Sequence, residues 1–358
     1  MEVDAKLVRL GVVGAGMIGR RHIETILACS DITELVGIAD PDSDAGKLLG
    51  IDVPFFRTHL ELLNKAKPDA VVIATPNSLH AQQGIDCCTH GVHFIVEKPV
   101  ADSVESAVDL LRAIRLSGVK TLVGHHRRYL PMVRSARQIL ADGHIGRLVA
   151  VSAIWATRKT NEYFQVPWRK EFGGGPVLIN GIHEIDLLRY LCGEIASLTG
   201  YTSSAVRNFP VEDASGALLN FQNGCIGTLI CADSGLSPWT MEQGTRENTM
   251  FPYAGENSHR FIGTEGSLEL PVLRLWSARN PRLIGWDKPL AVTPIEYVDC
   301  NPFVEQLKHF CRMIRVEESP VASAEEGART LVATLAITRS ARLGAPVDLT
   351  STFRLLTN

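Results

Sequence analysis

The pattern of apolar and polar positions changes along the chain, near residue 145. Before that point, short apolar runs rich in valine and isoleucine show little polar alternation and are separated by helical stretches. Strands that are buried on both faces of a parallel sheet have this pattern. The runs that we predict as strands lie at 7–13, 35–39, 70–74, 93–96 and 121–124. Their alternation with helices predicts a doubly wound α/β domain over residues 5–127.

Beyond it, residues 128–358 favour a second, α+β domain built on a large, open and mostly antiparallel sheet. Its predicted strands lie at 147–157, 214–221, 225–233, 259–264 and 267–270. Two helices are expected at the end of the chain, at about 302–316 and 323–343. Residues 234–258 mix Gly, Pro, Ser and Thr with charged residues, which is typical of a long loop or lid, or of a surface insertion without function.

Composition narrows the class of protein. The chain has 358 residues, 45% of them hydrophobic and 21% charged, which is an ordinary globular balance with room for two domains. Lys and Arg number 36 against 39 Asp and Glu, and the resulting net charge of −3 argues against a nucleic-acid binder. No apolar run approaches the roughly 20 residues that span a bilayer, and residues 1–4 are acidic where a signal peptide is basic. We therefore expect a cytoplasmic protein with neither nucleic acid nor membrane as a partner.

The eight cysteines agree with a reducing compartment. They are scattered through apolar segments and form no CxxC pair, which suits buried free thiols better than disulfides or a metal cluster. We expect no metal site.

A glycine-rich turn follows the first predicted strand directly and precedes a helix. It contains the GxGxxG residues Gly14, Gly16 and Gly19, with Met17 and Ile18 between the last two. In this context the first glycine permits a tight turn, the second lets a pyrophosphate approach the backbone, and the third lets helix and strand pack closely. The helix N-terminus then offers free N–H groups to the phosphates. The segment therefore predicts a dinucleotide site.

Asp40, which ends the second predicted strand, bears on the choice of dinucleotide. It lies 21 residues after Gly19, where a carboxylate can accept hydrogen bonds from both ribose hydroxyls and repels a 2′-phosphate. We therefore expect NAD rather than NADP, although Arg20 or Arg21 could reach a phosphate and leave NADP open.

Polar side chains also follow the third and fourth predicted strands. In open α/β sheets, ligands bind outside the carboxyl ends of the strands, so Lys98 is expected at the mouth of the cleft, near the nicotinamide. The alternative is a surface lysine paired with Glu97. For the turn after the third strand, the alternative is a helix cap with an incidental histidine. The cofactor contacts expected from these two turns are Thr75, Pro76, Asn77, His80, Glu97 and Lys98.

A third candidate segment, at 173–186, begins with three successive glycines, which let the backbone come close to another group. In the helix that follows, His183 and Asp186 share one face, and Asp186 could hold the imidazole in one tautomer. The alternative is a capped helix with one satisfied histidine.

Taken in order, these motifs resemble the Gfo/Idh/MocA family of NAD(P)-dependent oxidoreductases. The chain carries GAGMIG at 14–19, ADP at 39–41, TPNSLH at 75–80, EKP at 97–99 and GGG…GIHEID at 173–186. The similarity extends over nearly the whole chain, through GHHRRY at 124–129, GTEG at 263–266 and SARLG at 340–344.

The resemblance implies a Rossmann domain and a C-terminal domain whose open sheet forms the interface of a homodimer or homotetramer. It implies hydride transfer between nicotinamide and a hydroxyl or carbonyl carbon of a sugar, cyclitol or related polyol. By family pattern Lys98 is the catalytic lysine, and His183 is the second catalytic or substrate-binding residue. Weaker substrate candidates are Asn180, Trp168, Arg169, Tyr163 and His126.

The chain departs from the family pattern at two places. Many members carry an aspartate four residues before the histidine, where Ile179 stands here, so an Asp–His–Lys triad is in doubt and Asn180 could supply the polar contact instead. His125 and His126 stand where many members have an aromatic or small residue followed by asparagine.

Three alternatives to a polyol dehydrogenase stay open. Some relatives act on cis-dihydrodiols, and others use NAD transiently to hydrolyse glycosides. The third alternative is a non-enzymatic regulator that senses NAD.

Overall fold

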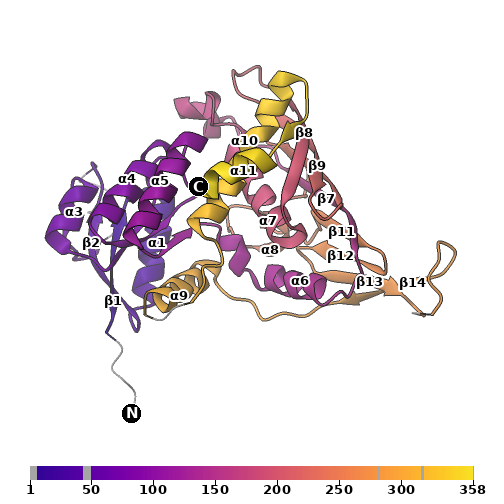
Figure 1. Ribbon diagram of the computed structural model, residues 1–358, viewed down its shortest axis with the longest axis horizontal. Coiled ribbons are helices and arrows are strands. Elements are labelled where there is room, and N and C mark those ends of the chain that lie inside the picture. Colours follow the sequence, from indigo (N-terminus) through magenta and orange to yellow (C-terminus); the bar gives the residue numbers. More distant parts are fainter. Residues whose placement is uncertain (1–5, 43–49, 281, 316–317, 358) are drawn as a thin grey trace, which may run out of the picture. The chain divides into compact units, whose positions relative to one another are not determined.

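The computed structural model (Figure 1) describes residues 6–42, 50–280, 282–315 and 318–357. Residues 1–5, with the acidic N-terminus and the first residue of the expected Rossmann domain, lie outside the described residues, as does Val316, the expected end of a helix. The chain divides into two compact units. The first comprises the described residues of 6–129, 300–331 and 355–357; the second comprises those of 130–299 and 332–354.

The first unit is built on a six-stranded, wholly parallel sheet in the order β3-β2-β1-β4-β5-β6. Every residue of β4 is buried, as the unbroken apolar run predicted. The strand at 93–96 was predicted to the residue, and the other four differ by no more than two residues at either end. The strands are β1 (Val8–Val13), β2 (Thr33–Ala39), β3 (Phe55–Phe56), β4 (Ala70–Ile73), β5 (His93–Val96) and β6 (Thr121–Val123).

Helices connect these strands, and one helix from far along the chain completes the core. α9 (Pro302–Arg315) packs on α1 (Met17–Ala28), and Leu307, Phe310 and Met313 join the buried cluster under the parallel sheet. The other helices are α3 (His59–Ala66), α4 (Asn77–Thr89), α5 (Val104–Ser117) and the 3₁₀ turn η1 (His126–Tyr129).

The described contacts thus divide the chain differently from the two segments expected from sequence. The helix expected at about 302–316 was assigned to the second domain, but α9 supplies apolar side chains to the first. The amphipathic pattern showed that a helix forms there and carried no information about which sheet it covers.

The second unit is built on a nine-stranded sheet in the order β14-β13-β12-β11-β7-β10-β9-β8-β15. Neighbouring strands are antiparallel except β7 and β10, which run parallel, so the expected large and mostly antiparallel sheet is confirmed. The strands are β7 (Leu148–Ala156), β8 (Ile195–Ser203), β9 (Ala214–Phe221), β10 (Ile226–Ala232), β11 (His259–Gly263), β12 (Gly266–Leu270), β13 (Arg274–Ala278), β14 (Leu290–Pro294) and β15 (Val347–Asp348).

Four of these strands were not predicted. β13 is half-buried at every position and β14 is mostly exposed, so neither shows a clear apolar alternation. β8 ends in exposed polar residues, and β15 has only two residues. The helices with residues in this unit are α6 (Pro131–Ala141), α7 (Ile182–Cys192), α8 (Met241–Thr245), α10 (Ala324–Leu343) and α11 (Thr350–Thr357).

The segment 234–258 is not simply a loop. It contains α8, whose residues Met241 to Gly244 are buried, and the Glu242 carboxylate accepts a 3.0 Å hydrogen bond from the indole of fully buried Trp155. The polar composition of the segment did not indicate this buried helix, because the Glu242–Trp155 hydrogen bond that holds it joins residues far apart in the sequence. Across the described residues, no helix combines the length and the apolar character that crossing a membrane requires.

Candidate active site

The glycine loop of the first unit has the geometry that its three roles require. Gly14 has φ +94°, and a Cβ there would lie 2.6 Å from the Ala74 carbonyl oxygen. A Cβ on Gly19 would lie 1.9 Å from the Gly14 carbonyl oxygen, so the start of α1 packs directly on the turn. At Gly16, by contrast, a Cβ would meet nothing within 4 Å. Gly14 and Gly19 therefore close the turn on itself, whereas Gly16 leaves open space where a pyrophosphate can approach the backbone.

The start of α1 suits an anionic group. Its N-cap, Gly16, has no side chain to satisfy the first N–H groups, and the first turn holds no acidic residue. Met17, beside it, is 78% exposed. Free N–H groups and the helix dipole favour a phosphate at this position. These residues fit a dinucleotide.

Asp40 has a structural contact in addition to its expected one. Its Oδ2 accepts a 2.7 Å hydrogen bond from the Ala15 N–H and thereby ties the end of β2 to the glycine turn. Arg20 donates from Nε to the Ala15 carbonyl oxygen at 3.1 Å, and the Arg21 guanidinium lies 5.4 Å from the centroid of the Phe303 ring. Both arginines thus have contacts within the protein, while the ribose contact of Asp40 stays a prediction.

The turn after β4 is tied to the turn after β5 by His80. This buried imidazole lies with Nδ1 2.7 Å from the Pro99 carbonyl oxygen and Nε2 2.8 Å from the Thr75 carbonyl oxygen. Thr75 in turn donates from its hydroxyl to Gln83 in α4 at 2.7 Å. His80 therefore holds together the two turns that carry the expected cofactor contacts, Asn77 and Pro76 on one side and Lys98 on the other.

Glu97 lies beneath this turn as a buried carboxylate. It is 5% exposed and accepts a 2.8 Å hydrogen bond from His22 Nε2 on α1, and its Oε2 accepts a 3.2 Å bond from the N–H of Lys98. A Cβ on Gly124 would lie 2.7 Å from the carboxyl group, so only glycine at the end of β6 leaves room for it. Glu97 therefore positions the backbone of Lys98, which is half-buried.

Electrostatics keep this carboxylate ionised. Burial alone raises the pKa of Glu97, but the hydrogen bond and attraction of His22, together with the charge of Lys98, outweigh burial and lower the pKa to about 2. An ionised carboxylate only accepts, so His22 Nε2 carries the hydrogen in this pair.

His126, a weaker substrate candidate, packs inside the first unit. Its ring stacks on Phe303 with centroids 4.6 Å apart and planes 16° from parallel. Burial, with the nearby charge of Arg127, lowers the pKa of His126 to about 3, so the ring is neutral under ordinary conditions.

In the second unit, the candidate histidine begins its helix after an unusual turn. Residues Val177–Gly181 form a π-helical turn, η4, directly before α7, and His183 lies buried in the first turn of α7. π-Helical turns are rare and occur often at functional sites. Ile179 and Asn180, the two positions that raised doubt about the family triad, both lie in this turn.

The triple glycine before η4 brings the backbone close to protein groups. A Cβ on Gly174 would lie 2.5 Å from the Trp168 carbonyl oxygen, and one on Gly175 would lie 2.2 Å from Glu212 Oε1. The same Glu212 oxygen accepts a 3.1 Å bond from the N–H of Val177, and burial raises the pKa of this carboxyl group. The expected close approach is confirmed, and it seats the η4 turn.

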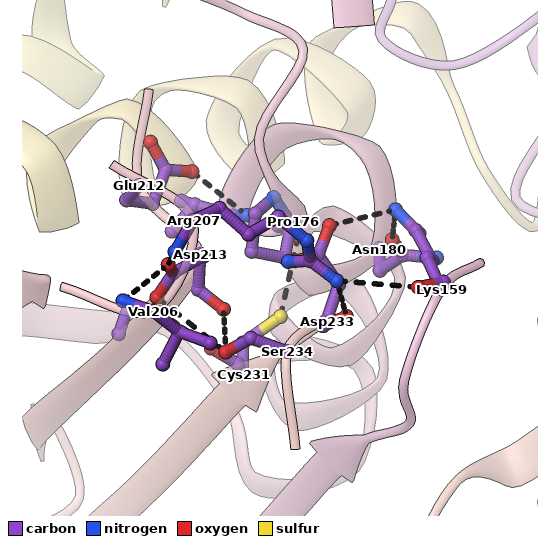
Figure 2. Close-up of polar contacts among 12 residues, drawn as sticks. Lys159, Pro176, Asn180, Val206, Arg207, Glu212, Asp213, Cys231, Asp233 and Ser234 are labelled. Atoms are coloured by element: carbon purple, nitrogen blue, oxygen red, sulfur yellow. Dashed lines mark hydrogen bonds and ion pairs between the residues drawn. The ribbon is translucent and has the colours of Figure 1, made fainter. Parts of the chain in front are cut away.

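Asn180 belongs to a polar network that the sequence did not indicate (Figure 2). Its Oδ1 accepts a 2.9 Å bond from the Lys159 ammonium, which also lies 3.3 Å from the buried Asp233 carboxylate. Asp233 pairs in addition with Arg207. Lys159, Arg207 and Asp233 follow β7, β8 and β10, respectively, in the sequence. Nothing in their local sequence pattern marks them as neighbours.

The other substrate candidates lie on the short turns after β7. Arg169 lies 4.0 Å from the centroid of the Tyr163 ring and donates to the Tyr163 carbonyl oxygen at 2.8 Å. Trp168 is 51% exposed. Structural contacts thus account for Arg169, while Trp168 is available to a ligand.

α7 is anchored by a buried pair that the sequence did not predict. The Glu184 carboxylate and the His259 imidazole on β11 lie 2.8 Å apart, and both side chains are fully buried.

Within the described part of the chain, no group of three or more His, Cys, Asp or Glu side chains is arranged to hold a metal ion. All eight cysteines are free thiols.

Comparison with known proteins agrees with this geometry. Residues 8–125 match the model described as the oxidoreductase family with an NAD-binding Rossmann fold, and residues 133–269 match the GFO/IDH/MocA C-terminal domain. The chain therefore belongs to the Gfo/Idh/MocA family of NAD(P)-dependent oxidoreductases, and its first unit carries the NAD-binding domain.

Among curated relatives, scyllo-inositol 2-dehydrogenase (NAD(+)) of Bacillus subtilis is 26% identical over 356 residues, which is 96% of each chain. The 2,7-anhydro-N-acetylneuraminate hydratase of Escherichia coli is 28% identical over 53% of this chain and 50% of its own. The solved WlbA dehydrogenase of Bordetella pertussis, in complex with NADH and UDP-GlcNAcA, shares the fold with a TM-score of 0.78. It is 24% identical, over 96% of this chain and 99% of its own.

Gly16→Ala separates nucleotide binding from folding. Because a Cβ there meets no protein atom, we expect the thermal midpoint of unfolding to stay within about 2 °C of wild type. The methyl group occupies space needed by the pyrophosphate, so NADH affinity, measured by fluorescence titration, falls about tenfold or more. Gly19→Ala is the contrasting variant, and it lowers stability as well. Unchanged NADH affinity in Gly16→Ala would contradict the assignment of the loop.

Glu97→Gln tests the buried carboxylate by stability against pH. The pKa is lowered from 4.5 to about 2 in the folded state, so the charge stabilises the fold above 4.5 and its contribution is lost as the pH falls toward 2. We expect the variant to lose about 3 kcal/mol in urea unfolding at neutral pH, a deficit that shrinks through that acidic range. The control is Glu24→Gln, an exposed carboxylate on the same helix as His22. A deficit independent of pH would contradict this account.

Proposed function

We propose that this chain catalyses NAD-dependent hydride transfer between nicotinamide and a hydroxyl-bearing or carbonyl carbon of a sugar, cyclitol or related polyol. The single observation that carries the proposal is membership of the family over both of its domains. A scyllo-inositol dehydrogenase that aligns with 96% of the chain supports the substrate class.

The proposed chemistry divides between two side chains. Bound NAD supplies the acceptor or donor of the hydride. Lys98 takes the proton from the substrate hydroxyl as the alcohol is oxidised, or returns it in reduction, and its charge stabilises the developing alkoxide. His183 binds the same oxygen and orients it. With Ile179 at the family's aspartate position, we assign the polar contact of that position to Asn180.

The surroundings of Lys98 support this role. Its backbone is held by Glu97 on one side and by the His80 contact to the Pro99 carbonyl oxygen on the other. A general base must first lie within hydrogen-bonding reach of the proton that it removes, and only then does its pKa affect the rate. These two contacts fix the position of the turn that carries Lys98.

The exposed face of the second unit's sheet supports self-association. Ile226 on β10 and Ile262 on β11 both lie beside Ala150 of β7, and Leu218 lies beside Thr228 in the next row. Both isoleucines and the leucine are about half exposed. We assign this apolar row to the interface of a homodimer or homotetramer, in keeping with a protein of the cytoplasm that acts on small molecules.

Ile226→Lys combined with Ile262→Lys tests this interface. Burying two new charges across a symmetric contact is costly, so we expect light scattering to report the wild type as a dimer or tetramer and the variant as a 39.1 kDa protomer. The control is Leu116→Lys, a more exposed apolar position in α5 of the first unit. A wild-type chain that is itself monomeric would overturn the assignment.

The function is tested by following reduced nicotinamide while wild type and Lys98→Ala are supplied with NAD and a panel of inositols, aldoses and cis-dihydrodiols. Wild type is expected to reduce NAD with a polyol, and Lys98→Ala to lose about 10²-fold or more in kcat because the base is absent. NADH titration is expected to show near-normal cofactor binding in the variant.

Lys65→Ala, which removes an exposed ammonium, is the control for the loss of a charge. Full turnover by Lys98→Ala would remove this lysine from the mechanism. Conversion of a glycoside without net NAD reduction would favour hydrolysis, and tight NAD binding without turnover of any substrate would favour a regulator.

A further inference from the structure

A cavity of about 370 Å³ lies within the second unit, a size typical of small-molecule sites. Among the described residues that line it there is no carboxylate. Cationic side chains and phenyl rings dominate its wall, namely Arg158, Lys159, Lys170, Arg207, Phe164 and Phe209.

Two of the cations are fixed from behind by one buried carboxylate. Asp233 is 1% exposed, lies 3.3 Å from the Lys159 ammonium and pairs with the Arg207 guanidinium, which also donates to the Asp233 carbonyl oxygen. Figure 2 shows these groups converging on Asp233. Because Asp233 is shared by two cations, it holds both in place. The Glu212 carboxyl group also interacts with the Lys159 charge, but burial raises the pKa of Glu212 and so disfavours its ionised form.

Two phenyl rings, and backbone hydrogen bonds to Asp213, restrict the cations further. The Arg207 guanidinium carbon lies 4.4 Å from the centroid of Phe164, and the Lys170 ammonium lies 5.5 Å from that of Phe209. The backbone N–H groups of Val206 and Arg207 donate to Asp213 Oδ2 at 3.0 and 2.8 Å. The wall is therefore organised before any ligand arrives, which lowers the entropic cost of binding.

The charge balance of this wall points to an anion. Four cations face the cavity, and the carboxylate that contacts two of them is buried behind the wall. Ligands that compensate such an excess carry a carboxylate or a phosphate, and the planar fork of arginine suits the oxygens of both.

Lys159 connects the cavity with the candidate active site. Its ammonium lines the cavity and also donates to Asn180 Oδ1 at 2.9 Å, on the turn that precedes His183. A molecule that contacts Asn180 through a hydroxyl can therefore extend an anionic group toward the cations.

We propose that this cavity binds an anionic substituent, a carboxylate or a phosphate, of the sugar or polyol substrate. The inference rests on the proposed function and narrows its substrate class to acidic sugars or sugar phosphates. Arg158 and Lys170 then determine specificity from the rim, while Lys159 and Arg207 form the fixed wall.

The test measures binding, so that it does not depend on hydride transfer. D-glucose, D-glucuronate and D-glucose 6-phosphate are titrated calorimetrically into the protein saturated with NAD. At about 10 mM sugar, a site with a Kd of about 1 mM is nearly saturated. We expect at least one anionic sugar to bind about tenfold or more tightly than glucose. A preference for glucuronate assigns a carboxylate, and a preference for glucose 6-phosphate assigns a phosphate.

The variants are Arg158→Gln and Lys170→Gln, with Lys288→Gln as the control, because Lys288 belongs to the same unit and does not line the cavity. The two cavity variants are expected to lose about tenfold in the ratio of anionic to neutral binding, whereas the control keeps that ratio. Thermal unfolding verifies that all three fold.

Equal or undetectable binding of all three sugars to wild type overturns the proposal, as does an unchanged ratio in both cavity variants. Tight binding of an anionic sugar with no turnover of any substrate would instead reject the proposed hydride transfer and leave the anion site standing. The two proposals can therefore fail separately.

Discussion

The first unit depends on one buried negative charge. Glu97 is removed from water at the end of β5, and an unpaired carboxylate in that position would be too costly to keep ionised. His22 on α1 supplies the hydrogen bond that compensates it, and Gly124 at the end of β6 supplies the space. One carboxylate thereby ties the helix that follows the glycine loop to two strand ends, and it accepts the N–H of the candidate catalytic lysine.

The second unit also contains a buried carboxylate whose charge is compensated by nearby side chains. Asp233 is buried and compensated by Lys159 and Arg207, which come from loops far apart in sequence. In the first unit, the buried His22 side chain compensates the charge of Glu97, and Lys98 follows directly after the end of β5. In the second, the compensating cations also line a cavity, so the pairing that stabilises the fold also gives the cavity its charge. A buried carboxylate thus organises a cationic functional group in both units.

Sequence patterns predicted the elements that carry the site better than those at the edges of the sheets. The parallel strands were recognisable because both of their faces are buried, and Gly14 and Gly19 because backbone packing excludes every larger residue. β13, β14 and β15 escaped because exposed or very short strands carry little apolar signal. The roles of Lys98 and His183 came from family resemblance, and they stay proposals together with the ribose contact of Asp40.

The sequence by itself determined the glycine-rich turn and the class of fold, because both depend on local rules of glycine geometry and residue periodicity. Only the tertiary structure decided that α9 completes the core of the first unit, that His22 pairs with Glu97, and that Lys159, Arg207 and Asp233 meet. The physical reason is the same in each case. An apolar helix face needs a surface to pack on, and a buried charge needs an opposite charge or a hydrogen bond. The sequence shows that need, whereas only the packing of distant segments decides which residue meets it.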